Sequence, residues 1–395
     1  MSTLREATEL RALIRSAAAG DDAVAEAITR LGPARVAATL VDELVSRADL
    51  GEVGPLPGPV TIRFDLDFDG RTLAYPVFLE EGRVWHGPDG PDGARPVLVE
   101  LELVALARAV FGGPMAPRAL CRRIDWGDVD DPREFMVGVA AAPVVQRLLR
   151  GTADEPARLD ELALMNGSDK WGPHFYTPIY ERHFAPLRQQ DLTILELGIG
   201  GYANPGGGGG SLRMWKRHFP RALVYGVDVY DKSAAAEQRV FPIQGDLSDP
   251  GFVGGLAGRL GPLDIVIDDG SHACADVILA FHALFPALRP GGLYVIEDLQ
   301  TSYWPSYGGD ATNLHDASTS MGFLKQLLDG LNHEEHDAEG SNRPTRFDTT
   351  LVGVHFYHNV AVLEKGRNAD GPLPGFVRQR PATQVERADR REVPV

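Results

Sequence analysis

Four residues that could bind a metal ion and move a proton follow two apolar segments of the chain. Asp269 and His272 stand in IVIDDGSH, and Glu297 and Asp298 end LYVIEDL. Carboxylates supply the hard oxygen ligands that suit Mg²⁺, and imidazole is the side chain suited to accept a proton near neutral pH. We therefore predict a metal site made by three carboxylates of the pairs Asp268-Asp269 and Glu297-Asp298. His272 would be the catalytic base beside it, the alternative being that these residues only cap a strand and a helix.

A second set of residues has the types and the order expected for adenosine binding. The segment ELGIGG at 196–201 follows another apolar run, and glycine there lets a ligand approach the backbone. Asp228 could accept both hydroxyls of a ribose, and the acid after the next strand could accept from an adenine amino group. This set suits S-adenosylmethionine, which has no pyrophosphate. The predicted cofactor-binding residues are Glu196, Gly198, Gly200, Ser211, Asp228, Gln244, Gly245, Asp246 and Asp269.

The same glycine turn leaves two other classes of protein open. With Ala203 it fits the dinucleotide fingerprint G-x-G-x-x-A, which is typical of a nicotinamide-dependent oxidoreductase. However, Asp228 lies 30 residues after Gly198, and the usual spacing is about 20. The glycine run at 206–210 also delays the helix that would hold a pyrophosphate. A non-catalytic module that binds S-adenosylmethionine is the second alternative, and it would not need His272.

Short apolar segments that alternate with helical ones must position these residues. The segments run over 192–201, 222–229, 239–247, 263–272 and 291–299. Their alternation predicts a parallel, doubly wound α/β sheet, in which ligands bind outside the carboxyl ends of the strands. Every candidate residue above falls at such an end. The alternating segment VGVHFYHNVAVLEK at 352–365 is interpreted as one further strand.

The first part of the chain has a different pattern. Residues 5–47 have helical periodicity with a break at Gly32-Pro33, and 60–87 alternate around an Asp69-Gly70 hairpin signal. Residues 97–112 are typical of a strand followed by a helix. We predict an N-terminal α+β auxiliary domain over 1–150 and a catalytic domain over 151–395. A lid insertion near 300–342 would carry the substrate-contacting residues Tyr303 and Trp304.

Charge and composition exclude several partners. The chain has 39 Lys and Arg against 55 Asp and Glu, a net charge of −16, and such a surface repels nucleic-acid phosphates. No apolar run approaches the 18 residues or so of a membrane span, and the first ten residues are charged rather than apolar. We expect no nucleic-acid or membrane partner and a cytoplasmic location.

Several motifs together resemble one enzyme family. LMNGSDK at 164–170 precedes His174, Tyr176 and Tyr180, and ELGIGG, VDVYDKS, GDLSD, IDDGSH and VIEDLQTSYW follow. This set, over about residues 160–310, is similar to the metal-dependent macrolide deoxysugar O-methyltransferases of mycinamicin and tylosin biosynthesis, and the N-terminal region resembles their auxiliary domain. The resemblance implies a class I methyltransferase fold, S-adenosylmethionine, Mg²⁺ and a homotetramer. By motif match it also implies that Asp269, Glu297 and Asp298 are the metal ligands and His272 the base, and it assigns no role to Asp268.

The resemblance further implies a reaction. The enzyme would methylate the 2-hydroxyl of a 6-deoxyallose-type sugar on a macrolide glycoside, as in the conversion of demethylmacrocin to macrocin. Mg²⁺ would acidify that hydroxyl, His272 would remove its proton, and the oxygen would attack the sulfonium methyl in line. A catechol-type O-methyltransferase, which also uses Mg²⁺ and carboxylates, is the nearest alternative.

Overall fold

The computed structural model describes residues 2–48, 50, 59–80, 83–86, 96–114, 116, 123–128, 130–152, 158–336, 343–374 and 377. The chain forms two compact units, residues 1–246 and 247–395. The domain boundary predicted at residue 150 lies inside the first unit and stays a prediction. Among the described residues, no helix is both long enough and apolar enough to cross a membrane.

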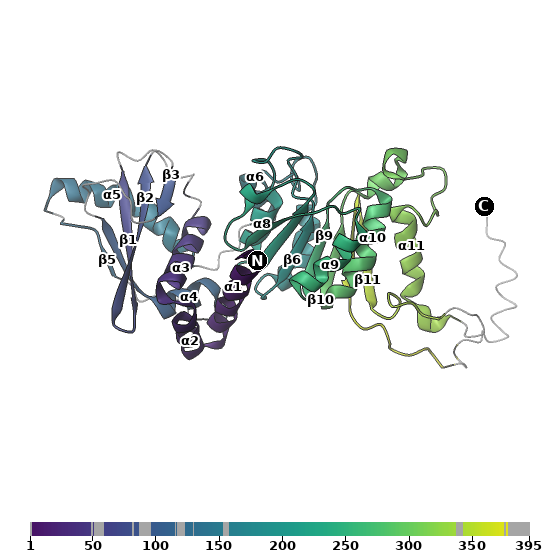
Figure 1. The fold of residues 1–395 in the computed structure, drawn as a ribbon, viewed down its shortest axis with the longest axis horizontal. Coiled ribbons are helices and arrows are strands. Elements are labelled where there is room, and N and C mark those ends of the chain that lie inside the picture. Colours follow the sequence, from purple (N-terminus) through teal and green to yellow (C-terminus); the bar gives the residue numbers. More distant parts are fainter. Residues whose placement is uncertain are drawn as a thin grey trace, which may run out of the picture. The chain divides into compact units, whose positions relative to one another are not determined.

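The N-terminal part of the first unit contains the predicted helices and the predicted hairpin (Figure 1). Its helices are α1 (Ser2–Ala19), α2 (Asp21–Leu31), α3 (Pro33–Arg47), α4 (Leu103–Phe111) and α5 (Pro132–Arg150). Its strands are β1 (Val60–Phe68), β2 (Arg71–Glu80), β3 (Arg83–His86), β4 (Val97–Glu102) and β5 (Arg123–Asp125), in the order β3-β2-β1-β4-β5. Ile62, Phe64 and Leu66 alternate along β1 and are fully buried. The φ angles of Asp69 and Gly70 are 51° and 69°, as a two-residue hairpin turn requires.

The rest of the first unit begins the predicted parallel sheet. Its helices are α6 (Leu159–Asn166), α7 (Thr177–Phe184) and α8 (Gly210–His218), and its strands are β6 (Thr193–Leu197), β7 (Leu223–Asp228) and β8 (Val240–Gln244). β6 pairs parallel with β7, and β7 pairs parallel with β8. β6 is buried along its whole length, which is typical of a strand covered on both faces.

The second unit continues with two more parallel strands and an antiparallel hairpin. Its helices are α9 (Pro250–Leu260), α10 (Cys274–Leu284) and α11 (Ser320–Gly330), and its strands are β9 (Leu263–Asp268), β10 (Leu288–Ile296), β11 (Leu351–Tyr357) and β12 (Val360–Lys365). β9 pairs parallel with β10, and β10 pairs antiparallel with β12. The single strand predicted over 352–365 is therefore wrong. The chain turns at His358-Asn359, where Asn359 has φ 63°, and β11 and β12 pair with each other.

The strand order β11-β12-β10-β9-β6-β7-β8 is that of a doubly wound sheet with an antiparallel edge. In each unit the parallel strands carry predicted ligand-binding residues at their carboxyl ends, where ligands of such sheets bind. The fold class predicted from the sequence is confirmed.

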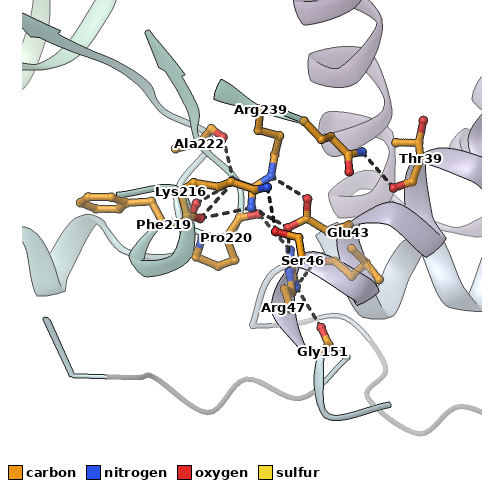
Figure 2. A network of polar contacts seen from close by, with 12 residues as sticks. Thr39, Glu43, Ser46, Arg47, Gly151, Lys216, Phe219, Pro220, Ala222 and Arg239 are labelled. Atoms are coloured by element: carbon orange, nitrogen blue, oxygen red, sulfur yellow. Dashed lines mark hydrogen bonds and ion pairs between the residues drawn. The ribbon is translucent and has the colours of Figure 1, made fainter. Parts of the chain in front are cut away.

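A buried cluster of charged side chains connects α3 to α8 and to the start of β8 (Figure 2). The Glu43 carboxylate accepts from Arg47 Nε at 2.8 Å and from Arg239 Nη2 and Nε at 2.5 and 3.0 Å. The remaining N–H groups of both arginines donate to backbone carbonyls, those of Val110, Gly151, Pro220, Lys216, Phe219 and Ala222. We call Glu43, Arg47 and Arg239 the Glu43 cluster. It fixes the N-terminal helices against the first strands of the parallel sheet.

Candidate functional site

The loop that follows β6, residues 198–209, folds back on itself, and we call it the glycine loop. Its last amide, Gly209 N, donates to the carbonyl of Ile199 at 2.8 Å. A Cβ at Gly208, whose φ is +90°, would overlap the carbonyl oxygen of Gly200. Only glycine allows this close approach of two backbone segments. The loop is thus a compact structure at the carboxyl end of β6.

Asp228, the last residue of β7, is bonded to this loop. Its Oδ2 accepts from Ile199 N at 3.1 Å, and its Oδ1 accepts from Tyr230 N at 2.9 Å. A carboxylate has about four acceptor positions, so two remain for the two hydroxyls of a ribose. The side chain is half-buried, which leaves it accessible to a ligand. The donor and acceptor chemistry at Asp228 therefore fits the predicted role.

The residues predicted for adenine binding lie next to Asp228. Gly245 N donates to the Asp228 carbonyl at 2.8 Å, and the Gln244 amide donates to the Val229 carbonyl at 3.1 Å. Asp246 follows them and is exposed. The first unit thus brings together the predicted cofactor residues that follow β6, β7 and β8. Their contact with a cofactor stays a prediction.

Glu196 and Ser211 face each other rather than the solvent. The fully buried Glu196 carboxylate accepts from Ser211 Oγ at 2.8 Å and from Trp215 Nε1 at 3.1 Å, and Lys170 Nζ lies 3.5 Å away. These bonds connect the LMNGSDK segment, the end of β6 and helix α8. Direct contact of Glu196 and Ser211 with the cofactor stays a prediction, whereas the bond between them is observed.

In the second unit, Asp269, His272 and Asp298 form a cluster after β9 and β10. One ligand atom of each lies within 4.8 Å of those of the other two, and His272 Nε2 is 3.6 Å from Asp298 Oδ2. The pairing explains this proximity, because β9 and β10 run parallel and end at the same edge, with Glu297 N bonded to the Asp268 carbonyl. The structure therefore brings together three of the four residues predicted for metal binding and proton transfer.

Two residues of this cluster have an uncommon backbone conformation. His272 has φ 57° and Asp298 has φ 51°, both in the left-handed region. A residue other than glycine there costs on the order of 1–3 kcal/mol, and such residues gather at functional sites. Both residues also belong to the cluster of three, which supports a functional role for it.

In each pair of adjacent acids, the first is buried and the second is half-buried. Asp268 and Glu297 are each 4% exposed, and Glu297 is not part of the cluster of three, so its role as a metal ligand stays a prediction. Burial, with the neighbouring charge of Asp269, raises the pKa of Asp268 to about 7. The hydroxyl of Tyr294 lies 3.4 Å from Asp268 Oδ2. Asp268 therefore belongs to the interior.

The aromatic residues predicted to contact substrate are exposed. Tyr303 and Trp304 have relative exposures of 37% and 48%, and the Trp304 ring lies 5.9 Å from that of Tyr307. Large exposed aromatic side chains are typical of binding surfaces. Their contact with substrate stays a prediction, as does the lid near 300–342, of which residues 337–342 lie outside the described part of the chain.

Two buried lysines next to the site have no assigned role in the sequence interpretation. Lys170 has no exposed surface and Lys232 is 2% exposed. Both stand in the motifs LMNGSDK and VDVYDKS, which carry the family resemblance. The available signal was a lysine placed inside each motif, and lysine is rarely buried without a specific partner.

Comparison with known proteins identifies the family. Residues 10–122 match the family "MycE methyltransferase N-terminal". The chain is 42% identical over 384 residues to the demethylmacrocin O-methyltransferase of Streptomyces fradiae, covering 95% of this chain and 96% of the relative. It is 44% identical over 375 residues to a rhamnosyl tetracenomycin-C 2'-O-methyltransferase of Streptomyces olivaceus, covering 91% and 95%. The chain belongs to the MycE family of O-methyltransferases.

A solved structure supports this family assignment over nearly the whole chain. The MycE methyltransferase of mycinamycin biosynthesis, in complex with Mg and SAH, matches with a TM-score of 0.86 and 37% identity, covering 97% of this chain and 99% of MycE. The predicted family, the class I fold and the enzyme class are thereby confirmed. Membership of this family excludes the two alternative classes, a nicotinamide-dependent oxidoreductase and a non-catalytic module that binds S-adenosylmethionine.

Proposed function

We propose that this enzyme transfers a methyl group from S-adenosylmethionine to the 2-hydroxyl of a 6-deoxysugar on a macrolide glycoside, with demethylmacrocin as acceptor and macrocin as product. The cofactors are S-adenosylmethionine and Mg²⁺, because SAH is what the donor becomes after transfer and MycE binds it with Mg. The observation that carries the proposal is the cluster of Asp269, His272 and Asp298 at adjacent strand ends.

The donor set of this cluster fits Mg²⁺. Asp269 and Asp298 offer carboxylate oxygens, and Glu297 is the third predicted ligand. The ion would act as a Lewis acid that stabilises negative charge on the sugar oxygen. Imidazole is a poor ligand for so hard an ion, so His272 is left to take the proton of the sugar hydroxyl.

The first unit supplies the residues for the methyl donor. Asp228 offers two remaining acceptor positions for the ribose hydroxyls, and the glycine loop allows close approach of the donor to the backbone. We assign Gln244, Gly245 and Asp246 to the adenine. The task of these residues is to hold the sulfonium methyl in one orientation for in-line attack.

The names of the relatives favour a sugar hydroxyl as acceptor. The rhamnosyl tetracenomycin-C enzyme is named for the 2'-position, and a mycinamicin VI enzyme of Micromonospora griseorubida, 39% identical, for the 2''-position. Two other relatives, 41% and 34% identical, are named for a 3'-position and a 3-position, so the names agree on a sugar acceptor rather than on one hydroxyl. This supports recognition of the sugar, with Tyr303 and Trp304 as contacts, over a catechol-type acceptor.

An acceptor panel tests the proposal. Purified enzyme with S-adenosylmethionine and Mg²⁺ is incubated with demethylmacrocin, mycinamicin VI, a rhamnosyl tetracenomycin and a catechol, and products are analysed by mass spectrometry and NMR. We expect one added methylene, located on the sugar 2-oxygen, with the fastest turnover for demethylmacrocin. EDTA should abolish turnover and Mg²⁺ restore it. Turnover of the catechol alone, or full activity in EDTA, would contradict the proposal.

The oligomeric state is a separate proposal. We propose a homotetramer, on the basis of the resemblance to the macrolide sugar methyltransferases. Light scattering coupled to size-exclusion chromatography measures the particle mass, which should be four times the chain mass of 42.8 kDa. A monomer or dimer at micromolar concentration would contradict it.

A further inference from the structure

Lys232 occupies the interior of the glycine loop. Its ammonium donates to the carbonyls of Tyr202 at 2.6 Å, Asn204 at 2.9 Å and Gly207 at 3.1 Å. An ammonium group has three N–H donors and no acceptor, so all three donors are used. All three acceptors come from one loop.

Burial of the Lys232 ammonium costs free energy, and its hydrogen bonds to the loop carbonyls must compensate for that cost. Lys232 is 2% exposed, and a buried charge is unfavourable without compensation. Its hydrogen-bond partners in the described part of the chain are carbonyl dipoles rather than a carboxylate. The carbonyls must therefore stay turned toward the ammonium, and this fixes the backbone of the loop. Tyr202, one of the three, has φ 46°, a conformation that requires such support.

The segment 228–232 holds the loop at both ends. Asp228 accepts from Ile199 N at the start of the loop, and Lys232, four residues later, binds carbonyls from its middle and end. One short segment thus determines both the shape of the loop and the place of the carboxylate predicted to bind ribose. A change at Lys232 would alter the glycine loop without removing any group that contacts the methyl donor.

We propose that Lys232 is a positioning residue that keeps the glycine loop in the conformation that binds S-adenosylmethionine. This rests on the proposed assignment of the loop and Asp228 to the cofactor. Lys232 touches no reacting atom. Its loss should therefore raise the Kd for SAH and the KM for S-adenosylmethionine, and leave kcat at saturating donor within about threefold of wild type.

Calorimetry with SAH on Lys232→Met tests this. We expect at least a tenfold weaker Kd, and faster hydrogen exchange of the loop amides at 199–209 in the ligand-free enzyme. Lys216→Met is the matched control. Lys216 is also buried, but it bonds Ser46 and Glu237, outside the loop. Its loss should lower Tm and leave the SAH affinity within twofold.

Further variants keep the outcomes distinct. Lys232→Arg retains the charge, but a planar guanidinium cannot match three carbonyls arranged around an ammonium, so a folded variant should still bind SAH more weakly. Wild-type affinity in folded Lys232→Met or Lys232→Arg, or equal loss in Lys216→Met, would overturn the proposal. Asp228→Ala distinguishes failure of the cofactor assignment from failure of the role proposed for Lys232. If it binds SAH normally, the cofactor assignment itself fails, whereas a tenfold loss there with normal Lys232→Met overturns only the role of Lys232.

Discussion

Replacing Glu43 by glutamine should destabilise the enzyme strongly, although no catalytic or binding role is proposed for Glu43. Glu43 has no exposed surface, and its two carboxylate oxygens bind Arg239 and Arg47 (Figure 2). Glutamine is similar in size but neutral, so both guanidinium groups would remain buried without their anion. The perturbation therefore removes a charge and little volume.

The size of the effect follows from this geometry. Removing one partner of a buried ion pair costs about 3–5 kcal/mol, because the remaining charge is left uncompensated. For a unit of 246 residues, 1 kcal/mol corresponds to about 2–4 °C in Tm. Glu43→Gln should therefore lower Tm by about 6–20 °C. Arg5→Ala is the control, because it breaks an ion pair with Glu9 in which the Arg5 side chain is 79% exposed. It should change the free energy of unfolding by no more than about 0.5 kcal/mol.

The effect depends on pH in a defined direction. Burial opposes ionisation of Glu43, but the charges of Arg239, Arg47 and Lys216 outweigh it and hold the pKa of Glu43 well below its ordinary value of 4.5. A lowered folded-state pKa contributes stability that is complete above 4.5, declines gradually below it and is lost fully only when the pH falls through the lowered folded-state pKa. The Tm difference between wild type and Glu43→Gln should thus be full at pH 7 and narrow at acid pH.

Thermal melts of full-length protein at pH 7 and at pH 4 measure these differences, and a double-mutant cycle adds a second criterion. Glu43→Met combined with Arg239→Met should cost less than the sum of the single changes, since each single change leaves a lone buried charge. A Tm change below about 2 °C in Glu43→Gln, or strict additivity in the cycle, would refute the account of the Glu43 cluster.

Three further outcomes follow from the site. His272→Asn, whose new residue also tolerates the left-handed backbone, should lower kcat by about 10²–10⁴ and leave the SAH affinity unchanged. A wild-type kcat in steady-state kinetics would contradict the role of His272 as the base. Asp298→Asn should raise the Mg²⁺ concentration for half-maximal rate, and an unchanged Mg²⁺ titration would contradict its role as a ligand. Lys170→Met should lower Tm by leaving Glu196 buried without its cation. Adding Glu196→Gln should recover part of that loss, and no recovery would contradict the pairing.

The parallel sheet could be predicted because its signals are local. Short apolar segments that end in acids or glycines define β6 to β10, and each strand carries its functional residue at its own end. The Asp69-Gly70 turn was also predictable, since both residues accept the positive φ that the hairpin needs. The hairpin of β11 and β12 was missed. Its turn, His358-Asn359, contains no glycine, and the alternation of side chains continues through it.

The buried charges could not be predicted, because their partners are distant in the sequence. Glu43 binds Arg239 across 196 positions, and Lys232 binds carbonyls 25–30 positions earlier. No periodicity marks such pairs, and lysine and arginine are usually at the surface. Only the fold shows that Lys170 and Lys232 are interior residues.

Burial separates acids that are adjacent in sequence. Asp268 and Glu297 are buried, whereas the residues that follow them, Asp269 and Asp298, are half-buried and meet at the cluster. Asp268 is the last residue of β9, inside the buried sheet, and Asp269 follows it. Glu297 and Asp298 follow the end of β10 at Ile296, and Asp298 leaves the extended conformation with φ 51°. Burial also raises the pKa of Asp268 to about 7, so at neutral pH it carries less than a full negative charge. Asp268 is therefore the weaker candidate for a cation ligand, and Asp269 beside it is the acid that belongs to the cluster.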